Sequence, residues 1–147
     1  MNKKGFTLIE LLVVVAIIGL LSTLAVVALG NARTKARDSK RLSDLKQMQT
    51  ALELYYTDNN NYPAGSGIDL GTTNYACLNV SGFTTTGCSD PYMAAVPTDP
   101  KSGQSYIYTL TASSTYTITA TLEVYEGQSV QRNHVLNDKD IVELHFS

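Results

Sequence analysis

The first thirty residues carry the feature that most constrains this 147-residue chain, a run of apolar side chains too long for a small soluble domain to bury. Residues 6–29 hold one charged side chain, Glu10, and as a helix they would reach about 36 Å, enough to cross a membrane core. Lys3, Lys4 and Gly5 precede the run. A secretory signal is cut after its apolar region. Cleavage after Gly5 would instead leave the helix on the mature chain.

The stretch Gly5-Phe6-Thr7-Leu8-Ile9-Glu10 resembles the start of type IV pilins and type II secretion pseudopilins. In that family a short basic leader is removed after a glycine, and the new N-terminal phenylalanine is often N-methylated. The resemblance implies a leader over residues 1–5, cleavage between Gly5 and Phe6, and N-methylation of Phe6. The implied partner for both steps is a prepilin peptidase/N-methyltransferase.

Glu10 indicates that the apolar run is more than an anchor. A carboxylate inside a bilayer segment costs roughly 2.5 to 3.5 kcal/mol on insertion scales, so it normally has a partner. Cleavage would create an ammonium group on Phe6, four residues before Glu10 and on the same helix face. We therefore predict that Glu10 pairs with such an ammonium, its own or that of the next subunit, during assembly. The alternative is a carboxylate tolerated near the helix N-terminus by the macrodipole.

Charge is distributed unevenly along the chain. Residues 1–46 hold eight Lys or Arg against three acids, whereas residues 47–147 hold three against ten. Such a polarity suits stacking of identical copies. Residues 33–41 alone hold five cations, and the positive-inside rule would keep them cytoplasmic. The family resemblance implies the opposite orientation, which we adopt, because a leader peptidase needs Gly5 on the cytoplasmic side. Phosphate contacts to nucleic acid are an open alternative for these cations.

The helix is expected to continue past the membrane over residues 30–61. Apolar side chains recur there at three- and four-residue steps, which predicts an amphipathic helix whose stripe is covered by a sheet. The stripe consists of Leu42, Leu45, Met48, Leu52 and Tyr55, with Ala51 and Tyr56 beside it, and the polar positions are Asp44, Lys46, Gln47, Gln49 and Glu53. The helix is predicted to run from Phe6 to Thr57 and to stop at the asparagines before Pro63.

Residues 62–105 are predicted to be loop, because they are rich in Gly, Thr and Ser. They contain the only two cysteines, Cys77 and Cys88. An even count in a segment expected outside the cytoplasm favours a disulfide, and closing that loop is worth roughly 2 to 4 kcal/mol. Two unpaired thiols are the alternative. Zinc is disfavoured, since a structural site needs four ligands.

Residues 106–147 are predicted to form an antiparallel sheet. Strands are expected at residues 106–110 and 116–124, where β-branched and aromatic residues are frequent, with residues 111–115 joining them as a hairpin. A third strand is expected within residues 129–136 and a fourth over 141–146, after a turn at 137–140. The segment Pro97-Thr98-Asp99-Pro100 also resembles the loop that precedes a strand in major pseudopilins.

Catalytic motifs are missing from the sequence. No G-x-S-x-G, Walker or H-E-x-x-H pattern occurs, and neither His134 nor His145 has a motif around it, so we predict that the chain is not an enzyme. No cofactor is expected, with calcium as the one open possibility. Asp138 and Asp140 are weak calcium candidates, because major pseudopilins carry calcium near this point. Full coordination needs six to eight oxygens.

Together these features predict an α+β chain of the pilin type, with a long N-terminal helix, embedded in the membrane over its first half, under a small antiparallel sheet. The resemblance implies a single-pass protein of the cytoplasmic (inner) membrane that assembles into a helical homo-oligomeric filament, outside the cell or in the periplasm. An ATPase-driven membrane machinery would be its partner. The alternatives are a major pseudopilin forming a short periplasmic fibre, a DNA-uptake or adhesive pilin whose head binds a ligand, and a membrane-anchored enzyme.

Overall fold

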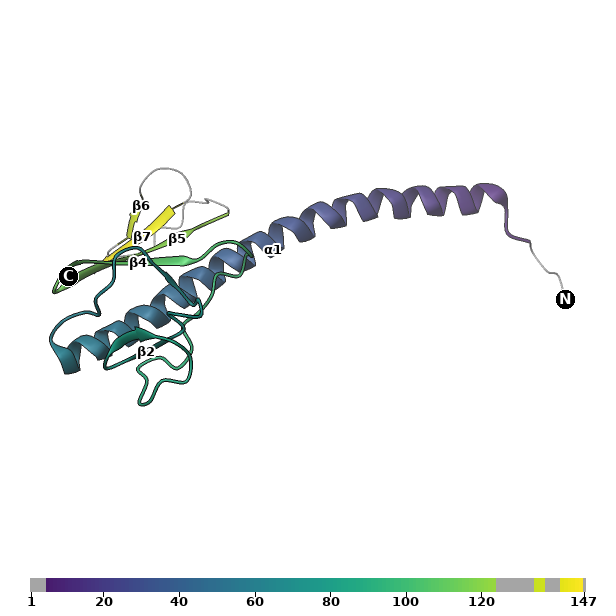
Figure 1. Cartoon of the computed structure of the whole chain (residues 1–147). Coiled ribbons are helices and arrows are strands. Elements are labelled where there is room, and N and C mark those ends of the chain that lie inside the picture. Colours follow the sequence, from purple (N-terminus) through teal and green to yellow (C-terminus); the bar gives the residue numbers. More distant parts are fainter. Residues whose placement is uncertain (1–4, 124–133, 137–140, 147) are drawn as a thin grey trace. The chain divides into compact units, whose positions relative to one another are not determined.

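The computed structural model describes residues 5–123, 134–136 and 141–146, and the chain forms two units, Met1–Lys35 and Ala36–Ser147. The second unit is called the head below. Helix α1, Leu8–Asn59, makes up most of the first unit and is also the first element of the head (Figure 1). The α+β class with one long N-terminal helix is therefore confirmed. The helix begins two residues later than predicted.

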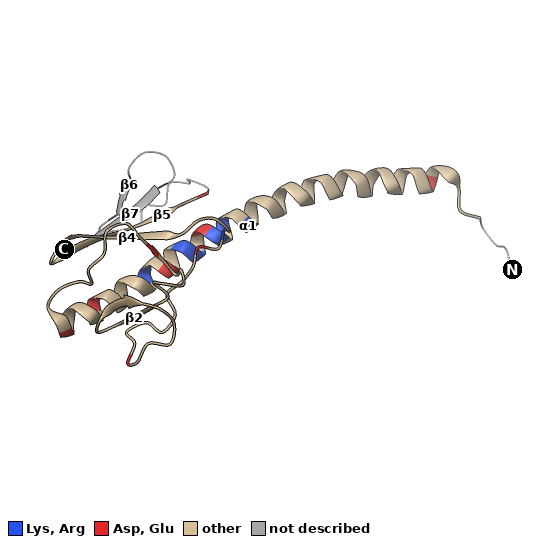
Figure 2. Cartoon of the chain, in the orientation of Figure 1, with Lys and Arg blue, Asp and Glu red and all other residues tan. Residues whose placement is uncertain are grey.

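The first unit leaves its apolar side chains uncovered. Every residue from 5 to 33 is exposed, and α1 contains a stretch long and apolar enough to cross a membrane. In Figure 2 this stretch is tan apart from one acidic position. An uncovered apolar helix of this length needs lipid or other apolar helices around it, because water is a poor solvent for it.

Within the head, α1 buries one stripe against the rest of the chain. The predicted stripe is confirmed at Leu45, Met48, Leu52 and Tyr55, which are all buried. Asp44 was expected on the polar side but is buried, because Tyr106 donates a hydrogen bond to it across the interface. The helix ends at Asn59, two residues later than predicted.

A left-handed residue caps this end of the helix. Asn60 has φ 56°, and its backbone N–H donates to the carbonyl of Tyr56 at 2.7 Å. Asparagine in this conformation is a common helix terminator, because its short polar side chain tolerates positive φ. The asparagines therefore end the helix as the sequence indicates.

The main sheet is antiparallel throughout and lies beside the second part of α1 (Figure 1). Its order is β1-β4-β5-β7-β6. The strands are β1 (Ile68–Leu70), β4 (Tyr106–Ala112), β5 (Thr115–Thr121), β6 (His134–Leu136) and β7 (Ile141–Phe146). The last strand spans the predicted residues, and β6 falls within the range predicted for the third.

The hairpin between β4 and β5 is tighter than predicted. The strands continue to Ala112 and begin again at Thr115, so that two residues form the turn and not five. The hydroxyl of Thr111 donates to the carbonyl of Thr115 at 3.0 Å, which extends the pairing into the region predicted as turn. A register shift between Leu110 and Ala112 accommodates this.

Residues 62–105 are not wholly loop, which corrects the sequence prediction. Strand β1 joins the edge of the main sheet, and β2 (Cys77–Asn79) pairs with β3 (Gly82–Thr84) in a separate two-stranded sheet. Each of these strands has three residues, too few for an alternation of side chains to be visible in the sequence. Their pairing is set by the partner strands.

The head core is aromatic and lies between α1 and the sheet. Four ring contacts link Phe83, Tyr108, Tyr116, Tyr62 and Tyr56 in series, with centroids 4.5 to 5.7 Å apart. Such edge and tilted contacts add to the area that the rings bury. The buried side chains of this core are Leu45, Met48, Ala51, Leu52, Tyr55, Tyr62, Leu70, Leu78, Val96, Tyr106, Tyr108, Tyr116, Ile118 and Ala120.

Candidate functional site

The first candidate site is the segment before α1. Gly5, Phe6 and Thr7 are not helical, and the Phe6 side chain is 79% exposed. A side chain on Gly5 would meet no atom within 4 Å. The predicted cleavage bond, between Gly5 and Phe6, therefore lies in backbone outside the helix, and both flanking residues are exposed.

Thr7 and Glu10 form a reciprocal cap on the first turn of α1. The backbone N–H of Thr7 donates to the Glu10 carboxylate at 2.9 Å, and the Thr7 hydroxyl donates to the same oxygen at 2.6 Å. The backbone N–H of Glu10 in turn donates to the Thr7 hydroxyl oxygen at 3.4 Å. This is the capping-box arrangement, which satisfies backbone donors that an open helix end would leave unpaired.

In the unprocessed chain the cap occupies the carboxylate of Glu10, which is folded onto its own first turn. Phe6 is bonded to Gly5 in this chain and therefore carries no ammonium group. The sequence prediction for Glu10 was an ammonium partner on Phe6, and the contact with Thr7 was not predicted. The spacing Thr-x-x-Glu before an apolar run was the available signal.

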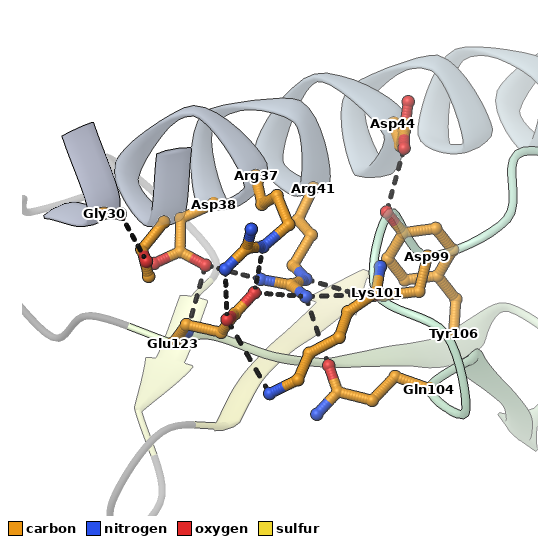
Figure 3. Close-up of polar contacts among 11 residues, drawn as sticks. Gly30, Arg37, Asp38, Arg41, Asp44, Asp99, Lys101, Gln104, Tyr106 and Glu123 are labelled. Carbon is orange, nitrogen blue, oxygen red and sulfur yellow. Dashed lines mark hydrogen bonds and ion pairs between the residues drawn. The ribbon is translucent and has the colours of Figure 1, made fainter. Parts of the chain in front are cut away.

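The second candidate site is a cluster of charged side chains at the start of the head, shown in Figure 3. Arg41 is fully buried and donates to Asp99 from Nε at 2.7 Å and from Nη2 at 2.8 Å. Its Nη1 donates to Asp38 at 2.6 Å, and Nη2 lies 3.1 Å from Glu123. Gln104 accepts a further bond from Nη2 at 3.1 Å.

Arg37 adds a second guanidinium to the cluster. Its Nε and Nη2 donate to the two carboxylate oxygens of Glu123, each at 2.6 Å. The ammonium of Lys101 lies 3.6 Å from Glu123, and the Glu123 backbone N–H donates to Asp38 at 3.0 Å. Helix, loop and the segment after β5 are thus joined by one network, which we call the arginine cluster and which centres on Arg37 and Arg41.

The cluster holds Glu123 and Asp99 in the charged form. The hydrogen bond from Arg37 is the main reason why the pKa of Glu123 falls to about 2, against an ordinary 4.5. Burial alone would raise the pKa of Asp99, but hydrogen bonds from Arg41 and from the Lys101 backbone outweigh burial and lower it. The pKa of Arg41 is raised, chiefly by its bond to Asp99. These groups therefore stay ionised at neutral pH.

The same cluster changes the interpretation of the basic run. Two of its five cations, Arg37 and Arg41, are held by carboxylates of the head. The donors that are already bonded to these carboxylates are not available to the phosphates of a nucleic acid. The cluster was not predicted from the sequence, although Arg41 stands four residues before Leu45 in the stripe that is buried.

The two cysteines are joined. Cys77 in β2 and Cys88 in the loop after β3 form a disulfide, with Cα atoms 6.3 Å apart, and no free cysteine is left. The bond closes the separate two-stranded sheet onto its own loop, where Met93 also pairs with Leu78.

The predicted calcium ligands, Asp138 and Asp140, lie outside the described residues. Within the part of the chain that the structure describes, no group of three or more His, Cys, Asp or Glu side chains is arranged to hold a metal ion. His134 lies in β6 and His145 in β7.

Comparison with known families gives two matches. Residues 1–26 match the prokaryotic N-terminal methylation motif, and residues 28–143 match the family model of type II secretion system (T2SS) protein G. The first match covers Gly5, Phe6 and Glu10. The second covers the arginine cluster, the disulfide and nearly all of the sheet.

Individual relatives match over shorter segments. The type II secretion system core protein G of Pectobacterium carotovorum subsp. carotovorum is 42% identical over 63 residues, which are 43% of this chain and 40% of that protein. The protein of the same name from Escherichia coli (strain K12) is 43% identical over 62 residues, 42% of this chain and 43% of that protein. The matches thus span less than half the length of these relatives.

A relative of another kind comes from Thermus thermophilus. Its type IV wide pilus major component PilA4 is 42% identical over 72 residues, 48% of this chain and 55% of that protein. No solved structure matches the chain.

Proposed function

Because the chain belongs to the type II secretion system protein G family, we propose that it is a structural subunit that polymerises through its N-terminal helix into a filament outside the cytoplasm. The observation that carries this proposal is the exposed apolar part of α1, preceded by Gly5 and Phe6 and interrupted only by Glu10. A helix of this kind can be covered first by lipid and then by the same helix of other copies.

Cleavage of the leader would convert the membrane-bound precursor into a subunit that can assemble. In the precursor, Glu10 is held by Thr7, and the basic leader is still attached. Cleavage after Gly5 would remove Lys3 and Lys4 and place an ammonium group on Phe6. That group would be the cation nearest to Glu10, because Arg33 lies more than about 30 Å further along the helix at 1.5 Å per residue. The Phe6 ammonium of a neighbouring copy would then align the two helices.

Two forms of filament are open to such a subunit. The family model for protein G favours a pseudopilin, which would form a short periplasmic fibre. The match to a wide pilus major component favours a surface pilus. Both forms need an ATPase-driven membrane machinery, and both use the first unit in the same way.

The test is made on protein produced in cells that carry such a machinery. Mass analysis of the exported or membrane-bound chain should show Phe6 as its N-terminus, with an added methyl group, and Gly5→Leu should leave the precursor in the membrane. Electron microscopy of sheared material should then show fibres that contain the processed chain. Fibres built from the uncleaved chain, or a processed chain that never polymerises, would contradict the proposal. Long surface fibres would identify a pilus, and fibres confined to the periplasm a pseudopilus.

A further inference from the structure

The face of α1 that points away from the head core carries two opposite charges in an otherwise small and polar row. Residues spaced alternately four and three apart line one face of a helix. Six residues of α1 with this spacing are all exposed, and we call them the outer row: Ser39, Ser43, Lys46, Thr50, Glu53 and Thr57.

Neither charge of the outer row is neutralised within the described residues. Lys46 forms no ion pair there, in contrast to Arg37, Lys40 and Arg41 on the same helix. Glu53 accepts one hydrogen bond, from the Tyr62 hydroxyl at 3.2 Å.

The pKa of Tyr62 is raised to about 12, first by burial and then by the Glu53 charge. Lys46 and Glu53 cannot pair on one helix, since seven residues separate them by about 10.5 Å along the axis.

Parallel copies of the helix change this geometry. If one copy is shifted along the axis by four residues, about 6 Å, its Phe6 ammonium comes beside Glu10 of the other. A shift of seven residues, about 10.5 Å, brings its Lys46 beside Glu53 of the other. In both pairs the cation precedes the acid in the sequence, so that both require a shift in the same direction.

One intermediate shift satisfies both pairs. The two ideal shifts differ by three residues, about 4.5 Å of helix. The flexible four-carbon stem of lysine covers such a difference. Small neighbours such as Ser43 and Thr50 leave room for the approach of a second helix.

We propose that the outer row is an interface between copies of this chain, in which Lys46 of one copy pairs with Glu53 of the copy beside it. This inference rests on the proposed filament and adds the register of the neighbouring subunits. The interface is heterologous, because each copy would pair its lysine with one neighbouring copy and its glutamate with another, and such contacts propagate into open helical assemblies.

Charge reversal tests the pair. Lys46→Glu and Glu53→Lys should each lower fibre yield by roughly tenfold or more, because like charges would then face each other across the interface. The double variant, with Lys46→Glu and Glu53→Lys together, restores opposite charges and the native net charge and should recover most of the yield. Gln47→Glu is the matched control, since it adds an acid at an exposed position beside the outer row. That control should assemble normally.

A zero-length carbodiimide cross-link provides a second readout on assembled fibres. Peptide mapping should show Lys46 joined to Glu53, and mixed isotope-labelled and unlabelled subunits should place the two residues on different copies. If native fibres form but the single reversals assemble at full yield, or Lys46 cross-links only to another protein, the inference is wrong and the filament proposal stands. If the native chain forms no fibres, the proposed function itself fails.

Discussion

Arg41 and Asp99 form a two-bond ion pair that is closed to solvent. The guanidinium of Arg41 is fully buried and the carboxylate of Asp99 is 1% exposed. The pair links the second turn of the head's helix segment to the loop before β4, and Figure 3 shows the two side chains directed at each other. Breaking a buried pair costs more than the attraction itself, because the remaining charge stays buried.

Replacing Arg41 should therefore destabilise the head strongly. Arg41→Met is expected to cost roughly 3 to 5 kcal/mol, since it leaves the Asp99 carboxylate buried without its main donor. Thermal or denaturant unfolding of the full-length protein in detergent measures this. Lys101→Met is the control, because Lys101 is about half exposed and lies 3.6 Å from Glu123, which keeps its two bonds from Arg37. It should cost less than about 1 kcal/mol, and equal effects of the two changes would contradict the role given to burial.

Acid should unfold the head by protonating Glu123. Its pKa is lowered from 4.5 to about 2 in the folded chain, so its stabilising effect is complete above pH 4.5 and is lost as the pH falls toward 2. The lowered pKa of Asp99 acts in the same direction. Unfolding midpoints of the native chain and of Glu123→Gln, measured across this range, should differ in slope, with the variant less sensitive to pH. Parallel curves would show that Glu123 is not responsible.

Gly71 should tolerate no side chain. It has φ 75°, and an added Cβ would lie 2.5 Å from the backbone oxygen of Pro97. Gly67 has φ 65° but open space around it, so Gly67→Ala reports the backbone strain alone, about 1 to 2 kcal/mol. Gly71→Ala should cost clearly more than this in the same unfolding experiment. Similar losses would mean that the loop carrying Pro97 moves aside easily.

Glu10→Leu should leave membrane insertion and leader cleavage intact and prevent normal assembly. The apolar replacement avoids the cost of a charge in lipid but removes the carboxylate that we propose pairs with the Phe6 ammonium. Glu10→Gln should be intermediate, because the amide can still hydrogen-bond. Fibre yield and N-terminal mass are the readouts. Normal fibres from Glu10→Leu would show that Glu10 only caps the helix and has no role in assembly.

The disulfide should be present in exported protein. Mass mapping without reductant should give one peptide pair cross-linked through Cys77 and Cys88. Reduction should lower the stability of the head by roughly 2 to 4 kcal/mol, the usual effect of opening a loop of this size. Free thiols on the exported chain would contradict this.

The long elements were predictable because each repeats a simple period. The buried face of α1 follows three- and four-residue steps, and Tyr116, Ile118 and Ala120 alternate in β5 and are all buried. The strands β1 to β3 were not predictable, since three residues in a Gly- and Thr-rich segment show no period and take their conformation from their partners.

The two candidate sites also differ in how far they could be predicted from the sequence. Gly5, Phe6 and Glu10 are close together in the sequence, so their combination could be recognised directly. The arginine cluster depends on Asp99 and Glu123, which are distant in the sequence and meet Arg41 and Arg37 only once the sheet is in place. Burial of Arg41 was still detectable in principle, because it continues the apolar stripe by one turn.

The spacing of the arginine cluster along the chain also sets an order of events during synthesis. Asp99 follows Arg41 by 58 residues, and Glu123 follows Arg37 by 86. At about 5 to 20 residues per second, Glu123 leaves the ribosome roughly 4 to 17 seconds after Arg37. A nascent chain that stops short of Glu123 cannot complete the network, however much helix it has already formed. Closure of the head around its two arginines is therefore a late event, which can occur only after the whole of β5 has been synthesised.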